Sequence, residues 1–137
     1  MSEDALILYC DGAARGNPGP ASIGAVILQE KSEAVVAEVS EAIGRATNNE
    51  AEYRALIRGL ERAVELKADR LRVRMDSELI VKQILGKYRV RNERLRPLYE
   101  EVRSLLLRIP TWSIEHVPRD RNKHADRLAN AALDLAQ

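Results

Sequence analysis

An apolar run near the N-terminus, Ala5–Cys10 (ALILYC), is nearly continuous. Such a run is typical of a central strand that is buried on both faces. Directly after it, Gly12–Pro20 (GAARGNPGP) carries the densest glycine and proline signal in the chain, which predicts that the strand ends and the chain turns tightly. The fold must therefore cover both faces of the sheet that holds this strand.

The rest of the chain divides into segments with strand or helix periodicity. Two strands joined by a short polar turn follow the first turn, a later strand alternates with arginines, and a last strand precedes the polar loop Pro118–Lys123. Apolar side chains at helical spacing indicate the helices. We expect strands at Ala5–Cys10, Ala21–Gln29, Ala34–Ala42, Leu71–Asp76 and Thr111–Val117, and helices from Thr47 to about Val64 and at Leu79–Leu85, Leu95–Ile109 and Ala125–Ala136.

The order of these elements, βββ-α-β-α-α-β-α, predicts a mixed α/β fold. Antiparallel strands come first and helix-separated strands follow, so the sheet should be mixed, with helices packed on its faces. The chain has 137 residues, which fits one compact domain with its own core. We expect a single domain over residues 1–137.

The sequence contains no membrane or export signal that we can identify. No run approaches the roughly 18 apolar residues that a membrane span requires. The N-terminus (MSED) lacks the positive region of a signal peptide. Cys10 is the only cysteine, so no internal disulfide can form. We therefore expect a cytoplasmic protein with no membrane association.

The distribution of charge says more than the net charge of +1, which argues against a uniformly basic surface for nucleic acid. The stretch Lys82–Arg108 holds eight basic residues and only three acidic ones. Two interpretations remain open for this stretch. It is either a patch that follows the phosphates of a nucleic acid or a solvated helix face.

Four carboxylates stand out by their position. Asp11 and Asp76 each end a predicted strand, and Glu52 and Asp126 lie in the first turns of predicted helices. Such positions can converge at one edge of a mixed sheet, where the four charges would repel one another. Divalent cations resolve that conflict, and an all-oxygen site without a Cys/His cluster favours Mg²⁺ or Mn²⁺. Taken singly, each acid is also explained as a turn former, helix cap or helix-dipole partner.

Glu50 is a rival to Glu52, because the two lie on opposite flanks of the apolar stripe and periodicity does not choose between them. However, Thr47-x-x-Glu50 matches a capping box, in which the two side chains bond the amides of the helix start. Glu50 then has a structural role, which leaves Glu52 as the better candidate for a metal ligand.

The motifs together resemble ribonuclease H of type 1. The resemblance rests on four segments in order and runs from about Ile7 to Ala132; the turn Gly16–Pro20 also resembles that of bacterial and archaeal members. The four segments are Asp11-Gly12 after the apolar strand, Thr47–Glu52 (TNNEAE), Met75–Ser77 (MDS) and Ala125–Asn130 (ADRLAN).

This resemblance implies a central five-stranded mixed sheet and a metal site formed by Asp11, Glu52, Asp76 and Asp126. It also implies a pocket for a phosphate of the DNA strand and a contact to bases in the minor groove. The matching pocket residues are Arg45, Thr47 and Asn92, and the base contact matches Asn48. A helix start suits a phosphate on its own physics, although Thr47 and Asn48 are also explained as caps.

The chain departs from the family pattern in two places. Many members carry a basic, tryptophan-rich protrusion between the middle helices, which here shrinks to Gly86–Arg91 with Tyr88 as its only aromatic residue. Binding should then depend on the basic stretch and be sensitive to salt.

The second departure concerns the assisting histidine that members carry on a loop before the last aspartate. His116 and Arg119 both match this position in some respect, and the sequence leaves both open. His124 is better explained as a surface residue at the helix start.

The activity that the resemblance implies is hydrolysis of the RNA strand of RNA/DNA hybrids. It would use two Mg²⁺ ions, for which Mn²⁺ can substitute, and leave 5′-phosphate and 3′-hydroxyl ends with little sequence preference. We expect a monomer whose partner is the hybrid, with double-stranded RNA as an open alternative. Rival interpretations are a binding module without turnover, a relative that acts on DNA, and an adaptor, but a binder or adaptor leaves the four acids unexplained.

Overall fold

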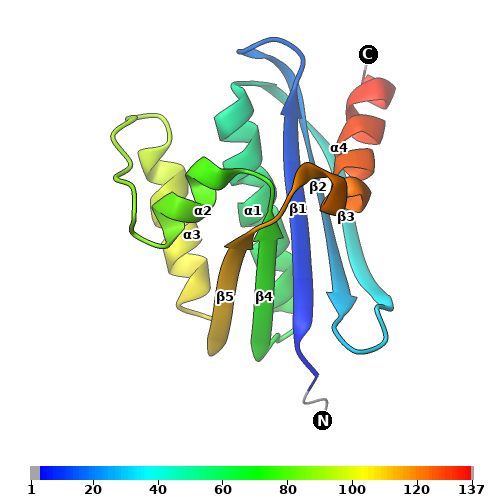
Figure 1. Ribbon diagram of the computed structural model, residues 1–137. Coiled ribbons are helices and arrows are strands. Elements are labelled where there is room, and N and C mark those ends of the chain that lie inside the picture. The colour runs from blue at the N-terminus through cyan, green and yellow to red at the C-terminus, as the bar shows by residue number, and fades with distance from the viewer. Residues whose placement is uncertain (1–3, 137) are drawn as a thin grey trace.

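The computed structural model describes residues 4–136, which form a mixed five-stranded sheet in the order β3-β2-β1-β4-β5 (Figure 1). β1 pairs antiparallel with β2 and parallel with β4, and β4 pairs parallel with β5. The predicted fold class and order of elements are confirmed. The strands are β1 (Leu6–Ala14), β2 (Gly19–Gln29), β3 (Val35–Ala46), β4 (Arg70–Met75) and β5 (Thr111–His116), and the helices are α1 (Asn48–Glu65), α2 (Glu78–Ile84), α3 (Arg96–Leu106) and α4 (Lys123–Ala136).

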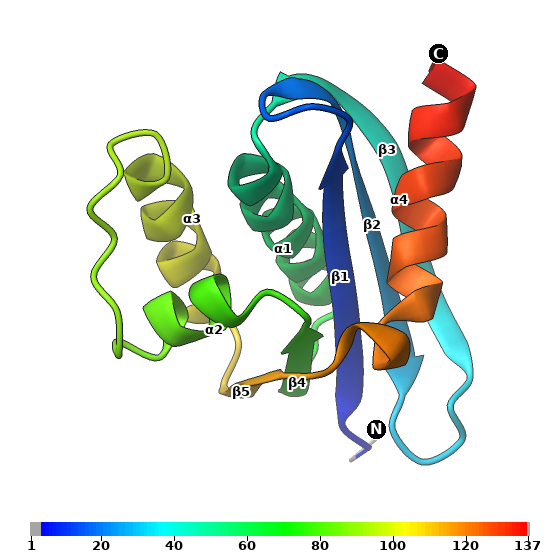
Figure 2. The same cartoon turned by 45° about the horizontal axis from the view of Figure 1, so that its top comes forward.

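Helices cover both faces of the sheet, as the apolar first strand requires. α1, α2 and α3 lie on one face, whereas α4 packs on β1, β2 and β3 from the other (Figures 1 and 2). The main core lies between α1 and the sheet, where Leu8, Leu56 and Leu60 are fully buried. None of the helices within residues 4–136 is both long and apolar enough to cross a bilayer.

The first strand is longer than the sequence predicted, so Asp11 does not end it. β1 continues through Asp11 and Gly12 to Ala14, because β2 supplies hydrogen-bonding partners as far as the pair Ala14–Ala21. Pairing with β4 stops at Tyr9. Asp11 therefore lies where β1 extends past the end of its parallel neighbour, which leaves one side of the strand open for a site.

Smaller differences affect other boundaries. β3 ends at Ala46 rather than Ala42, because its pairing with β2 continues beyond a register shift. β4 ends at Met75, and Asp76 is the first residue after it. The polar loop before α4 contains a short 3₁₀ turn, η1 (Arg119–Arg121). The carboxyl ends of the parallel strands and the starts of α1, α2 and α4 thus meet at one edge of the sheet.

Candidate functional site

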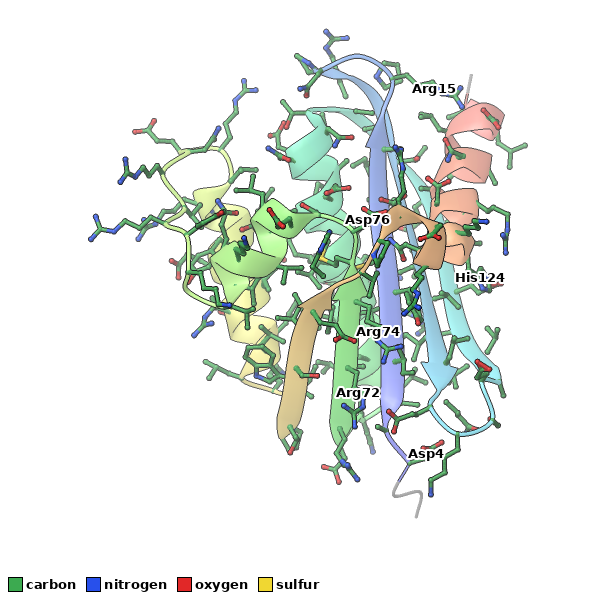
Figure 3. The ribbon with its side chains drawn as sticks, viewed as in Figure 1. Asp4, Arg15, Arg72, Arg74, Asp76 and His124 are labelled. Carbon is green, nitrogen blue, oxygen red and sulfur yellow. The ribbon has the colours of Figure 1, made fainter. Side chains whose placement is uncertain are left out.

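Three carboxylates from three different elements meet at this edge. Asp11 comes from β1 and Glu52 from the N-terminal part of α1. Asp76 is the residue after β4 (Figure 3). One carboxylate oxygen of each lies within 4.8 Å of the others. Asp11 and Glu52 are buried and Asp76 is half-buried, and all three line a cleft of about 590 Å³.

A close contact between α1 and β1 at Gly12 brings Glu52 to Asp11. A Cβ atom at Gly12 would lie 2.2 Å from the carbonyl carbon of Ala51 and 2.4 Å from the backbone nitrogen of Glu52. Only glycine permits the helix to approach the strand this closely. The glycine after Asp11 is therefore required by the close approach of α1 that positions Glu52.

A second close contact seats α4 over the same edge. Gly24 pairs with Asp11 in the neighbouring strand, and a Cβ atom there would lie 2.2 Å from the carbonyl oxygen of Ala125. The next residue, Asp126, lines the cleft from the first turn of α4, and its side chain raises the pKa of Asp11. Asp126 is not part of the tight group formed by the other three acids. It is half-buried and lies beside that group.

The cluster is electrostatically strained without a counter-charge. Burial first, and then the charge of Asp76 and the hydrogen bond to Asp126, raise the pKa of Asp11 to about 9. Burial also raises the pKa of Glu52 to about 7, against the effect of a hydrogen bond with Ser77. Burial and the nearby acids raise the pKa of the Cys10 thiol well above its ordinary value, so this residue offers no thiolate to a soft metal.

The predicted capping box at the start of α1 is confirmed. The backbone N–H of Thr47 donates to Oε1 of Glu50 at 2.8 Å, and Oγ1 of Thr47 accepts from the backbone N–H of Glu50 at 3.1 Å. The bond from the Thr47 backbone lowers the pKa of Glu50. Glu50 is thus held by the capping box at the start of α1 and does not line the cleft, whereas Glu52 does.

The two candidates for the assisting group differ in position. Arg119 of η1 lines the cleft, and its positive charge opposes the burial that raises the pKa of Glu52. His116 is the exposed last residue of β5 and is not among the described residues that line the cleft. The Nε2 of His124 lies 2.6 Å from Oε2 of Glu38, so His124 joins α4 to β3 (Figure 3). The roles of His116 and Arg119 stay predictions.

The residues that match the DNA-phosphate pocket lie around the start of α1. Arg45 is exposed near the end of β3, and Thr47 caps α1. Asn92 is exposed in the loop before α3, and its Oδ1 accepts from the backbone N–H of Arg94 at 2.8 Å. The charge of Arg94 reaches Glu50, so this loop and the start of α1 are neighbours.

Asn48, the residue matched to the base contact, lines the carboxylate cleft. Its backbone N–H donates to Oδ1 of Asn17 at 3.0 Å, which joins the start of α1 to the β1–β2 turn. Neither Arg45 nor Asn92 is among the described residues that line this cleft. Of the residues matched to the phosphate pocket, Arg45 and Asn92 therefore lie outside the carboxylate cleft.

Three polar residues that the sequence did not single out contact the carboxylates. Ser77 lines the cleft and opposes the burial that raises the pKa of Glu52, and the Nδ2 of Asn122 donates to Oδ2 of Asp76 at 3.4 Å. The Nδ2 of Asn130 lies 3.2 Å from Oδ1 of Asp126, one helical turn away. Ser77 and Asn122 flank helix starts, where a capping preference explains them without any site, so only the fold reveals these contacts.

Comparison with known proteins assigns this arrangement to a family. A family profile described as reverse transcriptase-like matches residues 9–132. The bifunctional protein Rv2228c of Mycobacterium tuberculosis is 48% identical over 131 residues, which is 96% of this chain and 36% of that protein. Ribonuclease HI of Halobacterium salinarum is 48% identical over 128 residues, 93% of this chain and 64% of that protein. The chain thus spans about one third to two thirds of the length of these curated relatives.

Solved structures agree in fold. The crystal structure of RNase H1 from H. salinarum superposes with a TM-score of 0.91 at 47% identity, covering 95% of this chain and 98% of that one. The structure of LC11-RNase H1 in complex with an RNA/DNA hybrid gives a TM-score of 0.89 at 44% identity, covering 96% and 98% of the two chains. The chain belongs to the ribonuclease H family.

Membership of the ribonuclease H family and the carboxylate cluster together indicate a divalent metal. The donors in the cluster are all carboxylate oxygens, which suit a hard cation, and no histidine or cysteine is in the group among the described residues. The raised pKa values of Asp11 and Glu52 point the same way, because burial and the charge of Asp76 disfavour both carboxylates, and a bound cation would offset this cost. The residues present therefore fit a metal ion.

Proposed function

We propose that this ribonuclease H domain hydrolyses the RNA strand of RNA/DNA hybrids, with little sequence preference, and leaves 5′-phosphate and 3′-hydroxyl ends. One observation carries the proposal: the oxygens of Asp11, Glu52 and Asp76, from three separate elements, lie within 4.8 Å of one another. A module that only binds nucleic acid gains nothing from such a cluster, which repels the phosphate backbone and destabilises the fold.

We propose two Mg²⁺ ions as the cofactor, with Mn²⁺ as a substitute, held by Asp11, Glu52, Asp76 and Asp126. When bound, the ions would neutralise charge, activate water and stabilise the leaving oxygen. The buried position of Asp11 and Glu52 keeps their carboxylates fixed in direction, so little reorganisation is needed when substrate arrives. Asp76 and Asp126 are both half-buried, and the Nδ2 of Asn130 donates to Oδ1 of Asp126 at 3.2 Å.

Arg119 is the side chain that we propose to assist the reaction. It lines the cleft beside Glu52, and its guanidinium is a permanent cation that can hydrogen-bond a phosphate oxygen. An arginine cannot act as a proton shuttle at neutral pH, so its proposed part is to orient and stabilise the phosphate. His116 remains the alternative, and it would have to act from the end of β5.

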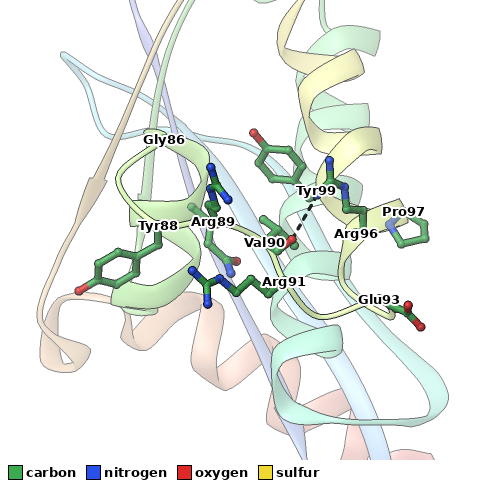
Figure 4. Close-up of a pocket in the computed structure, with 10 residues that line it drawn as sticks. Gly86, Tyr88, Arg89, Val90, Arg91, Glu93, Arg96, Pro97 and Tyr99 are labelled. Carbon is green, nitrogen blue, oxygen red and sulfur yellow. Dashed lines mark hydrogen bonds between the residues drawn. The ribbon is translucent and has the colours of Figure 1, made fainter.

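We propose that hybrid binding uses two further surfaces. One is the start of α1 with Arg45, Thr47 and Asn92, which would hold a phosphate of the DNA strand, with Asn48 reaching bases in the minor groove. The other is the loop between α2 and α3 with the start of α3, where Arg89, Arg91 and Arg96 line a pocket of about 890 Å³ (Figure 4). The LC11 relative in complex with an RNA/DNA hybrid supports the choice of ligand.

A cleavage assay with labelled duplexes tests this function. The hybrid, double-stranded RNA and double-stranded DNA are each incubated with Mg²⁺, Mn²⁺ or EDTA. We expect cleavage of the RNA strand of the hybrid in Mg²⁺ and Mn²⁺, none in EDTA, and intact DNA throughout. The double-stranded RNA lane decides whether that duplex is a second substrate.

Asp11→Asn, purified in the same way, is the matched control against contaminating nuclease. Cleavage that persists in this variant would come from another protein or another site. A hybrid that stays intact with either metal, although the protein is shown to bind it, would support a binding module and contradict the proposal.

A further inference from the structure

Asn122 is an almost completely buried amide beside the carboxylate cluster, with 1% of its surface exposed. It lies between η1 and α4, and its Nδ2 donates to the carbonyl oxygen of Cys10 at 3.0 Å and to Oδ2 of Asp76 at 3.4 Å. Cys10 is the residue before Asp11 and the first in β1 beyond the pairing with β4. One amide thus bonds the strand that carries Asp11 and the side chain of Asp76.

The direction of this amide is determined by its neighbours. Cys10 and Asp76 both present oxygens that only accept hydrogen bonds, so the NH₂ group must face them. The Oδ1 atom of Asn122 is then buried and has no hydrogen-bond partner among the described residues. An unpaired buried carbonyl is costly to stability, so the position of this amide is better explained by its two donated bonds than by packing.

The backbone of Asn122 reaches a further acid. Its carbonyl oxygen accepts the backbone N–H of Asp126 at 3.1 Å, so the turn of α4 that carries Asp126 starts from Asn122. The residue therefore contacts Asp76 directly, Asp126 through the helix start, and Asp11 through the carbonyl of the preceding residue. Within residues 4–136, no other side chain donates hydrogen bonds to both β1 and Asp76.

We propose that Asn122 is a positioning residue that fixes the carboxylate of Asp76 and the start of α4 relative to β1, so that the acids are arranged for metal ions before the ions bind. This inference rests on the proposed function. A donor on one oxygen of a carboxylate fixes its rotation and disperses part of its charge. Outer residues of this kind typically change metal affinity or activity by about 10-fold to 100-fold.

The test compares two substitutions at Asn122 in the full chain. Asn122→Ala removes the donors, and Asn122→Leu removes them while it fills similar space and eliminates the unpaired carbonyl. Ser22→Ala is the matched control, because Ser22 is also buried and its side chain also donates a hydrogen bond between two elements, from β2 to the carbonyl of Ala129 in α4, without lining the cleft. Urea unfolding reports stability, and calorimetric titration with Mn²⁺ alone reports metal affinity without any turnover.

We expect both Asn122 variants to fold and to bind Mn²⁺ about 10-fold or more weakly than the wild type. At a fixed Mg²⁺ concentration below saturation, kcat on hybrid should fall at least 10-fold, excess Mg²⁺ should restore part of it, and KM should change less than about threefold. Ser22→Ala should keep Mn²⁺ affinity and kcat within about twofold, whatever its loss of stability.

Unchanged Mn²⁺ affinity and kcat in Asn122→Leu would overturn the proposal. So would a loss of kcat that Ser22→Ala shares in proportion to its loss of stability, or the failure of both Asn122 variants to fold, since each outcome gives Asn122 a purely structural role. The wild type separates this proposal from the function itself. If wild-type protein neither binds Mn²⁺ nor cleaves hybrid, the proposed function fails; if it does both and the Asn122 variants match it, only this inference fails.

Discussion

At the scale of single residues, burial decides what the acids of this chain do. Asp11 and Glu52 are buried beside a third carboxylate, and their pKa values are raised to about 9 and about 7. In the unfolded chain such groups lose their protons near pH 4. The folded, metal-free protein therefore retains protons that the unfolded chain has released.

The first prediction concerns the pH dependence of stability. Because the folded-state pKa values are raised, their contribution to stability is complete near pH 4 and is lost as the pH rises through about 7 and then 9. In EDTA, the free energy of unfolding in urea should fall between pH 5 and pH 9. Asp11→Asn should flatten this fall and be more stable than wild type at pH 8 by ~1 kcal/mol or more, since one pKa unit corresponds to about 1.4 kcal/mol. Wild-type stability that rises over this range would contradict the assignment.

A second prediction separates two neighbouring acids. Glu50 is a cap and Glu52 lines the cleft. Glu50→Gln keeps an acceptor for the Thr47 amide, so its cleavage rate should stay within about threefold of wild type, with ~1 kcal/mol or less of lost stability. Glu52→Gln should lower kcat by about 100-fold or more and raise the stability of the metal-free protein. Equal losses of kcat in the two variants would remove the distinction.

At the scale of elements, close contacts at two glycines hold the helices that carry Glu52 and Asp126. These contacts explain why the site depends on residues without functional groups. A third prediction follows for Gly24→Ala, whose new Cβ would lie 2.2 Å from the Ala125 carbonyl oxygen and push α4 away. We expect a loss of ~1–3 kcal/mol of stability and weaker Mn²⁺ binding.

Gly44→Ala is the control for that prediction. Gly44 has a φ of +78°, so alanine there is strained, but a Cβ would meet nothing within 4 Å. This variant should lose stability and keep its Mn²⁺ affinity. If Gly24→Ala keeps its Mn²⁺ affinity as well, the seating of α4 does not control the site.

The loop between α2 and α3 supports a fourth prediction, on salt. Arg89 and Arg91 are exposed, and contacts from them to phosphates would release counterions. The affinity of the wild type for hybrid should fall steeply between about 50 and about 200 mM salt. The double variant Arg89→Ala/Arg91→Ala should reduce the slope of log affinity against log salt concentration by about one for each lost phosphate contact. Arg58→Ala, which removes an arginine paired with Glu41 and Glu61, should not change it; equal slopes in all three proteins would make the loop a solvated surface.

Some element boundaries could be predicted from the sequence and others could not. The capping box at Thr47 and the order of elements followed from local chemistry and periodicity. The extension of β1 through Asp11 did not, because strand pairing with β2 overrides the turn preference of Gly12. The role of Gly24 depends on α4, about a hundred residues later in the chain, so no local pattern contains it.

At the scale of the whole molecule, the site exists because a mixed sheet gathers distant segments. β1 and β4 run parallel, so Asp11 and Asp76 reach the same edge, and the helices on opposite faces bring Glu52 and Asp126 to it. The four acids were predicted as a group from their positions at strand ends and helix starts and from their motifs. The structure brings Asp11, Glu52 and Asp76 together, with Asp126 lining the same cleft. Asn122 was not predictable, since its bonds to Cys10 and Asp76 exist only in the assembled fold. A monomeric state and a cytoplasmic location stay predictions from the sequence.

The measurement that tests the proposed chemistry most directly is single-turnover cleavage of a labelled hybrid by wild type and Asp76→Asn, with hybrid affinity measured in parallel. Asp76→Asn keeps the side-chain shape and removes one charge from the metal site. It should fold normally and bind hybrid within about tenfold of wild type, or about 1.4 kcal/mol, yet cleave orders of magnitude more slowly in Mg²⁺. Cleavage by Asp76→Asn at the wild-type rate would remove Asp76 from the site and contradict the metal-dependent mechanism.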